Sequence, residues 1–305
     1  MRTLILLALA GLGAQLVDGS LGMAHGVIST ALLLALGTGP AVASAVVHFA
    51  QIGTGLVSGA SHARLGNVDW RVVARIGAPG CAGAFLGATV LSRLSTDTAE
   101  PVMAAILLAL GLYVAVRFTL RGLPQGGLGR PLRTRFLVPL GLVAGFLGAT
   151  GGGGWGMIGT PALLASGRME PRKVIGSVDA SKFLVAVAAS LGFLLSLGSH
   201  GVNWSWVLAF LLGGMVIAPV AAWLVRFVAP RILGSAVGGL IVVTNVGTLI
   251  DSDWASVTGT AAVCLYVFLY AVWAAALAYS VRAHLRERAA AATLTGGEQR
   301  QPAGA

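Results

Sequence analysis

The chain of 305 residues is 56% hydrophobic and only 10% charged, and its mean hydropathy is +0.87. These proportions leave too few polar residues to cover a soluble globule, so they exclude that class and predict a polytopic membrane protein. The net charge of +10 does not indicate a nucleic-acid-binding protein. Lys and Arg fall almost wholly in short segments between apolar runs, where the positive-inside rule expects them.

The two cysteines and the two ends of the chain are expected to carry no chemistry. Cys81 and Cys264 lie within apolar runs, which offers neither a disulfide framework nor a metal-ligand spacing, and we expect no cofactor. The N-terminal apolar run continues to Val17 and has a counterpart in the second half, so we interpret it as mature structure rather than a signal peptide. Residues 289–305 lack apolar periodicity and are expected to be disordered.

Eleven apolar segments follow one another along the chain. A helix needs about 20 apolar residues to cross the hydrocarbon core, and four segments fall at or below that limit. These four form two pairs, each joined at a glycine-containing break. In chain order the segments are approximately 3–17, 21–37, 40–61, 71–92, 101–120, 136–149, 155–167, 172–198, 204–228, 231–250 and 254–281, the four short ones being 3–17, 21–37, 136–149 and 155–167.

The second pair repeats the first at an offset of about 130 residues. The run from His25 to Gly37 aligns with the run from Trp155 to Gly167, and downstream Pro40 aligns with Pro171. The segment Asn67-Val68-Asp69-Trp70 aligns with Gly201-Val202-Asn203-Trp204. We interpret this as an internal duplication, in which one unit is used twice.

The basic residues predict how the two copies are oriented. They mark alternate loops, and all of these loops fit on the cytoplasmic side only if 136–167 enters and leaves by the same face, as a re-entrant hairpin. The same geometry in 3–37 predicts an N-terminus outside and a C-terminus in the cytoplasm. The residues that mark the basic loops are Arg64, Arg71, Arg75, Arg117, Arg121, Arg130, Arg133, Arg135, Arg168, Arg172, Lys173, Arg226, Arg231, Arg282, Arg286 and Arg288.

The resulting fold class is an all-α polytopic membrane protein built from two inverted repeats. Each repeat would be a re-entrant half-helix hairpin plus three transmembrane helices, an odd number, so the copies would run in opposite directions across the membrane. We predict a first repeat at 1–121, a basic cytoplasmic linker at 122–135, a second repeat at 136–250, an extra helix at 251–288 and a tail at 289–305.

The motifs together resemble the sulfite exporter TauE/SafE family of membrane anion permeases over roughly residues 10–285. The resemblance is carried by Gly151-Gly152-Gly153-Gly154-Trp155-Gly156-Met157-Ile158-Gly159-Thr160-Pro161, by His62…Gly66-Asn67-Val68-Asp69-Trp70, and by the duplication. It implies transport of small sulfur-containing anions, such as sulfite, thiosulfate, sulfoacetate or related sulfonates, across a bacterial inner membrane. The chain departs from the family pattern at Gly19-Ser20-Leu21-Gly22-Met23-Ala24-His25 and at Asp179-Ala180-Ser181-Lys182, which leaves the identity of the anion open.

A first candidate site lies at the glycine breaks. Glycine costs about 1 kcal/mol against alanine inside a helix, so the run Gly151, Gly152, Gly153 and Gly154 is expected to serve through its exposed backbone. A half-helix that begins there presents unpaired N–H groups and the positive end of its dipole, which suits an anion. In the first copy the corresponding residues are Ser20, Gly22 and His25. The alternative is that the glycines only permit close helix packing.

A second candidate site consists of ionisable and amide side chains inside the spans. Lys182 lies near mid-depth with Asp179 one turn earlier, and His48 and Gln51 take the equivalent positions in the first copy. Lys182 would balance the charge of the anion, Asp179 could hold it or exchange a proton, and the histidines could carry a proton. Alternatively, Asp179 and Lys182 form a structural ion pair, and His48 and Gln51 bond to neighbouring carbonyls.

We therefore predict a secondary transporter that is not an enzyme. Its partners would be a small anionic substrate and the lipid bilayer, with no nucleic acid and with a homodimer possible in principle. An anion channel, or a permease for another small anion, is the alternative. An intramembrane hydrolase using Ser20 and His25 is disfavoured, because the second copy has no serine at the equivalent position.

Overall fold

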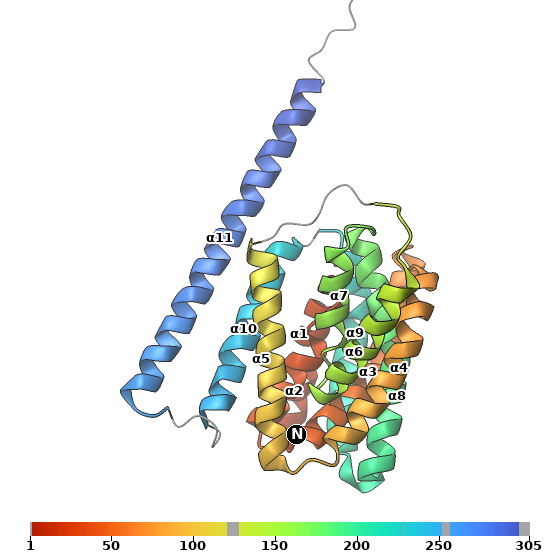
Figure 1. Ribbon diagram of the computed structural model, residues 1–305, viewed down its shortest axis with the longest axis vertical. Helices are drawn as coiled ribbons and strands as arrows, with labels where there is room; N and C mark the ends of the chain where they lie inside the picture. Colours follow the sequence, from red (N-terminus) through yellow and green to blue (C-terminus); the bar gives the residue numbers. More distant parts are fainter. Residues whose placement is uncertain (1, 121–127, 228, 252–256, 299–305) are drawn as a thin grey trace, which may run out of the picture.

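The computed structural model describes residues 2–120, 128–227, 229–251 and 257–298 (Figure 1). Every regular element in these ranges is helical, as the composition predicts. In chain order they are α1 (Arg2–Leu21), α2 (His25–Ala35), α3 (Pro40–Arg64), α4 (Trp70–Leu91), α5 (Thr96–Leu120), α6 (Thr134–Thr150), α7 (Trp155–Ala165), α8 (Pro171–Leu197), the 3₁₀ turn η1 (Ser199–Gly201), α9 (Trp204–Leu224), α10 (Pro230–Asp251) and α11 (Thr260–Glu298).

Seven of these helices are long and apolar enough to cross a membrane, namely α1, α3, α4, α5, α8, α9 and α11. The shorter apolar helices include α2 and α7, with 11 residues each, and α6 with 17. An all-α protein with several membrane-spanning helices is thereby confirmed. The half-length helices follow the glycine-containing breaks, where the sequence places them.

Helix α1 differs from the prediction, because it is a full-length helix of 20 residues and does not end near Val17. The sequence loses its apolar character at Gln15, Asp18 and Ser20, which are all buried in the protein rather than exposed to lipid. A polar side chain inside a membrane is tolerated where another part of the protein satisfies it. The helix therefore continues through these residues to Leu21.

The helices pair in a pattern that follows the duplication. Helix α1 packs against α9 and α6 packs against α4, while α3 packs against α8 and α5 against α10. At the offset of the repeat, α1 corresponds to α6 and α9 to α4, so the first two pairs are counterparts of each other. In Figure 1, α2 lies toward the lower end of the bundle and α7 toward the upper end.

Matching local signals begin the equivalent helices of the two halves. Pro40 and Pro171 lie in the first turn of α3 and α8. A backbone N–H at this position has no acceptor within the helix, so proline loses no hydrogen bond there. Asp69 caps α4 by accepting hydrogen bonds from the N–H groups of Arg71 and Val72, at 3.0 and 3.3 Å. Asn203 caps α9 in the same way, by accepting from Trp206 N at 3.3 Å.

Helix α11 lies on the outside of the bundle, where it contacts α10 and α5 (Figure 1). Its most apolar stretch has no buried residue, which fits a helix surrounded by lipid. The sequence predicts this extra span, although the helix continues to Glu298 through a stretch where disorder was expected. Four consecutive alanines at 289–292 favour helix there, and residues 299–305 lie outside the described ranges.

Candidate functional site

Each hairpin turns at residues with left-handed backbone. Between α1 and α2 these are Gly22, with φ of 68°, and Ala24, with φ of 93°. Between α6 and α7 they are Gly152 and Gly153, with φ of 71° and 101°. Glycine adopts such angles without strain, which is why the breaks fall at these residues.

The two breaks contact each other through a reciprocal pair of hydrogen bonds. Thr30 of α2 donates from Oγ1 to the carbonyl oxygen of Gly152 at 2.6 Å. Thr160 of α7 donates from Oγ1 to the carbonyl oxygen of Gly22 at the same distance. Thr30 aligns with Thr160, and Gly22 with Gly152, at the offset of the duplication. The half-helices α2 and α7 therefore hold each other at their starting ends.

Backbone contact between the half-helices is as close as glycine permits. A Cβ atom on Gly26 would collide with the backbone of Gly153, and one on Gly156 would collide with the backbone of Gly22 and Met23. Gly26 and Gly156 are again equivalent in the duplication. Close packing is thus one function of these glycines, as the alternative interpretation of the sequence proposes.

The glycine run itself mainly terminates α6, contrary to the expectation that its backbone is free. The N–H of Gly151 donates to Leu147 O at 2.8 Å, and those of Gly153 and Gly154 donate to Gly148 O at 2.6 and 3.2 Å. Carbonyl groups at a helix C-terminus need such partners. The donors left for a ligand are the first N–H groups of α7, at Trp155 and Gly156, which have no acceptor within a helix.

Several buried side-chain donors near the breaks have no hydrogen-bond partner among the described residues. They include the ring N–H of His25, whose two ring nitrogens are both without a partner, and the Nε2 atoms of Gln15 and Gln51. Gln51 Nε2 lies beside the break of the second half, since a Cβ on Gly153 would stand 3.1 Å from it. Buried polar atoms are almost always paired, so such a group of donors indicates room for a ligand that accepts hydrogen bonds.

An ion cluster lies beside the first break. Lys182 Nζ donates to Asp179 Oδ1 at 2.6 Å, as their spacing on α8 predicts, and also to Asp18 Oδ2 of α1. Ser58 Oγ of α3 donates to Asp179 Oδ2 at 2.5 Å, and His62 Nε2 lies 3.6 Å from the same oxygen. Each of these residues is at most 3% exposed.

Asp18, Ser58 and His62 are the members of this cluster that the sequence did not reveal as candidates. In the sequence, His62 is part of the segment that carries the family resemblance. The sequence does contain one indication of this cluster: a carboxylate next to the break of α1 needs a cation if it is buried. Lys182 is the membrane-embedded cation that supplies it.

Two predicted site residues are satisfied inside their own helices. The His48 Nδ1 atom lies 2.8 Å from the carbonyl oxygen of Ser44, and its ring faces Phe193, with 5.7 Å between centroids. Ser20 Oγ donates to the carbonyl oxygen of Leu16. Among the described residues, neither forms a hydrogen bond with Asp179 or Lys182.

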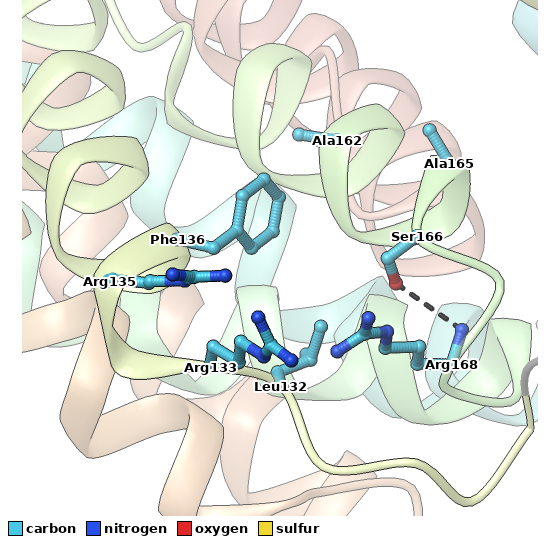
Figure 2. A pocket seen from close by; sticks show the side chains of 8 residues that line it. All are labelled: Leu132, Arg133, Arg135, Phe136, Ala162, Ala165, Ser166 and Arg168. Carbon is cyan, nitrogen blue, oxygen red and sulfur yellow. Dashed lines mark hydrogen bonds between the residues drawn. The ribbon is translucent and has the colours of Figure 1, made fainter.

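Arginines surround a pocket of about 400 Å³ at the end of the bundle where the 128–133 segment runs (Figure 2). Figure 2 shows Arg133 and Arg168 pointing toward each other from opposite walls, with Arg135 beside Phe136. Arg168 Nη1 donates to Pro131 O at 3.0 Å, which anchors this segment against the end of α7. Arg133 and Arg135 have no ion-pair partner among the described residues, so the pocket has a positive field.

Known membrane proteins resemble this chain over most of its length. "Probable membrane transporter protein YtnM" of Bacillus subtilis (strain 168) is 48% identical over 280 residues, which cover 92% of this chain and 93% of that protein. A "Probable membrane transporter protein" of Xylella fastidiosa (strain 9a5c) is 30% identical over 78% of this chain and 91% of its own length. No solved structure matches the chain significantly. The family model described as "Sulfite exporter TauE/SafE" matches residues 7–248, which contain both hairpins, their breaks and the ion cluster, and the chain therefore belongs to this family of membrane transporters.

Proposed function

We propose that this protein is a secondary transporter of small sulfur-containing anions, sulfite or an organosulfonate such as sulfoacetate, in a bacterial inner membrane. The observation that carries the proposal is the meeting of α2 and α7 at their N-terminal ends, through Thr30 with Gly152 and Thr160 with Gly22. Two helix N-termini directed at one place form a backbone site for an anion.

The unpartnered donors support the same class of ligand. An oxyanion accepts several hydrogen bonds, and the N–H groups of His25, Gln15 and Gln51 are buried donors without an acceptor. We assign to the binding site His25, Gln51 and Gly152, together with the first N–H groups of α7. Gly22 and Gly153 shape the site, because their N–H groups bond to Asp18 O and Gly148 O. Ser20, His48, Gly151 and Gly154 support the shape of the site in this proposal, since their hydrogen bonds stay within their own helices or caps.

Lys182 and Asp179 act through the electrostatic field of the site. The Lys182 ammonium already contacts two carboxylates, so it does not supply a free positive charge to the anion. In the proposed mechanism, this cluster sets the charge beside the break of α1. The anion itself is held by helix N-termini and neutral donors.

We infer that the two halves are inverted repeats that rock against each other to expose the site alternately to each side. The reciprocal pairing of α1 with α9 and α6 with α4 supports this, because exchange of the halves leaves the pattern unchanged. Placing the arginine pocket in the cytoplasm follows the positive-inside rule, and it sets the N-terminus outside and the C-terminus inside. The pocket would then attract anions to the cytoplasmic entrance.

A binding screen tests the proposal. Purified protein is heated with sulfite, thiosulfate, sulfoacetate, sulfate or phosphate, and a ligand at 100 times its dissociation constant adds about 2.7 kcal/mol of stability. We expect a shift for at least one sulfur-containing anion, and a lost shift in Gln51→Leu. Equal shifts for all five anions, or none for any, would contradict the proposal.

A channel is the second candidate, and flux measurements in liposomes distinguish it. A carrier shows saturable uptake and counterflow of labelled anion, because each turnover needs a conformational change. A channel shows single-channel currents instead. The close contact of Gly26 with Gly153 favours a carrier, since the path is closed at the breaks in this conformation.

A further inference from the structure

The ion cluster beside the first break has an unequal number of charges. It contains the two carboxylates of Asp18 and Asp179 and the single ammonium of Lys182. The hydrogen bonds of His62 assign it one hydrogen and no charge: Nδ1 accepts from Asn67 Nδ2 at 3.4 Å, and Nε2 donates to the carbonyl oxygen of Gly19 at 3.1 Å. With both carboxylates ionised, the cluster has a net charge of −1.

Among the described residues, no second Lys or Arg forms an ion pair with the cluster. Arg64 of α3 is exposed, Arg172 and Lys173 lie in the first turn of α8, and His48 of α3 packs against Phe193. Helices α7 and α9 contain no titratable side chain, and α2 contributes only His25, whose backbone N–H faces Asp18. Helix α4 contributes Cys81 and two arginines, Arg71 and Arg75, which line a separate pocket at the end of the bundle. The charged residues of α5 and α10 lie in the end turns of those helices. A proton is therefore the simplest means of neutralising the cluster.

We propose that Asp18, His62, Asp179 and Lys182 form a proton-binding site that couples anion transport to the movement of one proton in the same direction. This inference rests on the proposed function. Asp18 Oδ1 lies 3.4 Å from the backbone N of His25, the first residue of α2, so the ionised carboxylate occupies the helix N-terminus that the anion needs. Protonation of Asp18 removes that competing charge and frees the N–H for the anion.

Asp18 accepts the exchangeable proton because it has weaker hydrogen-bond support than Asp179. Asp179 accepts from Ser58 at 2.5 Å and from Lys182 at 2.6 Å, with His62 3.6 Å away. Asp18 accepts one hydrogen bond from Lys182 and a long one, of 3.4 Å, from the backbone N–H of His25. A carboxylate with more donors is held more firmly in its ionised form.

His62 is the member of the cluster next to the loop between α3 and α4, where Asn67 covers its Nδ1 atom and must turn aside before a proton reaches that atom. Asn67 is 4% exposed and adjoins His62, which stands in the last turn of α3. The His62 ring takes a proton at Nδ1 and gives the one on Nε2 to Asp179. Lys182 then donates one proton to Asp18 and regains one from Asp179. One proton has moved from the Nδ1 side of His62 to Asp18, and Lys182 is again an ammonium. His62 returns to its first tautomer when its ring reorients.

The test uses the full chain in liposomes that enclose a pH indicator, with thiosulfate and sulfoacetate as the probes. Both anions keep a constant charge between about pH 6 and about pH 8, so any pH effect comes from the protein. We expect anion uptake to acidify the lumen. At pH values above the one at which the cluster takes up its proton, the apparent affinity for the anion should rise about tenfold for each unit by which the pH falls, because proton and anion bind together.

Two variants separate proton coupling from transport itself. Asp18→Asn should lose lumen acidification and the pH dependence of affinity, so that any counterflow of labelled anion that remains no longer varies with pH. His62→Gln, which cannot pass a proton, should slow lumen acidification several-fold. Asp97→Asn is the matched control, because this carboxylate is exposed in the first turn of α5 and should behave like the unmodified protein.

The outcomes distinguish failure of the inference from failure of the proposed function. If the unmodified protein binds and moves neither anion at any pH, the proposed function is wrong. If it moves them without acidifying the lumen and with constant affinity, the transporter stands and the proton site is overturned. Persistent proton movement in Asp18→Asn also overturns it. Should that variant fail to fold, the pH dependence of the unmodified protein decides alone.

Discussion

Thr30 and Gly152 lie 122 positions apart in the chain and are joined by a 2.6 Å hydrogen bond from the threonine hydroxyl to the glycine carbonyl. The equivalent pair, Thr160 and Gly22, makes the same bond in the opposite direction between the halves. Because each half-helix secures the break of the other, neither hairpin is independent. Movement of one break must stretch or exchange both bonds.

Replacing Thr30 by valine should therefore destabilise the protein and impair transport. Valine keeps the shape but leaves the buried Gly152 carbonyl without its donor, which costs about 1 to 2 kcal/mol. Detergent unfolding of purified protein measures this change, and Thr30→Ser should recover most of it. Thr89→Val is the control, since that hydroxyl bonds to Phe85 O on an exposed face of α4. Equal effects at both threonines would contradict the prediction.

Replacing Gly26 by alanine should separate the two half-helices. The added methyl group would meet the Gly153 backbone, which cannot move aside as a flexible side chain does. Overpacking of this kind costs about 1 to 3 kcal/mol, and we expect a lower melting temperature with loss of anion binding. Gly13→Ala on α1 provides the comparison, because nothing lies within 4 Å of its added Cβ atom. An unchanged Gly26→Ala protein would show that the breaks separate freely.

Replacing Lys182 by methionine should be among the most destabilising single changes in the chain. It leaves Asp18 and Asp179 facing each other without a cation, and breaking a buried ion pair costs about 3 to 5 kcal/mol. The double variant Asp18→Asn with Lys182→Met removes one charge of each sign. Its stability should exceed that of Lys182→Met, which a double-mutant cycle measures. Additive losses would mean that the two side chains do not interact.

Neutralising the arginine pocket should slow anion capture in a manner that depends on salt. Arg133→Gln combined with Arg135→Gln removes two unpaired positive charges from the pocket. We expect uptake from dilute anion to fall several-fold at low ionic strength and to match the unmodified protein near 1 M salt, where the screening length is about 3 Å. Arg282→Gln on α11, away from the pocket, should have no such effect. A salt-independent loss would indicate a structural role instead.

The sequence was sufficient to predict the two glycine-containing breaks, because the signals are local, whereas the inverted orientation of the two halves stays a prediction. Glycine marks a break wherever a left-handed angle is required, as at Gly22 and Gly152, and the duplication puts the breaks in register. The aligned threonines at positions 30 and 160 carry a signal that was available but unused. In the structure each of these hydroxyl groups has its acceptor in the other half.

Contacts between distant segments could not be predicted in the same way. The sequence indicates that Asp179 and Lys182 share a face of α8, but not that Asp18 completes the pair from α1. The end of α1 was misplaced for the same reason, because burial of Asp18 in protein becomes visible only when α8 is packed against it. Similarly, a run of glycines does not reveal that three of its N–H groups cap the preceding helix.

The pairing of Asp18 with Lys182 also bears on how the protein is made. The two residues are separated by 164 positions, so α1 enters the membrane long before its cation has been synthesised. During that interval the carboxyl group has no ammonium to bind, and the first hairpin cannot complete its polar interior. Assembly of the first half must therefore wait for α8 to be inserted, and a ribosome stalled before residue 182 should leave a chain that membrane quality-control proteases can recognise.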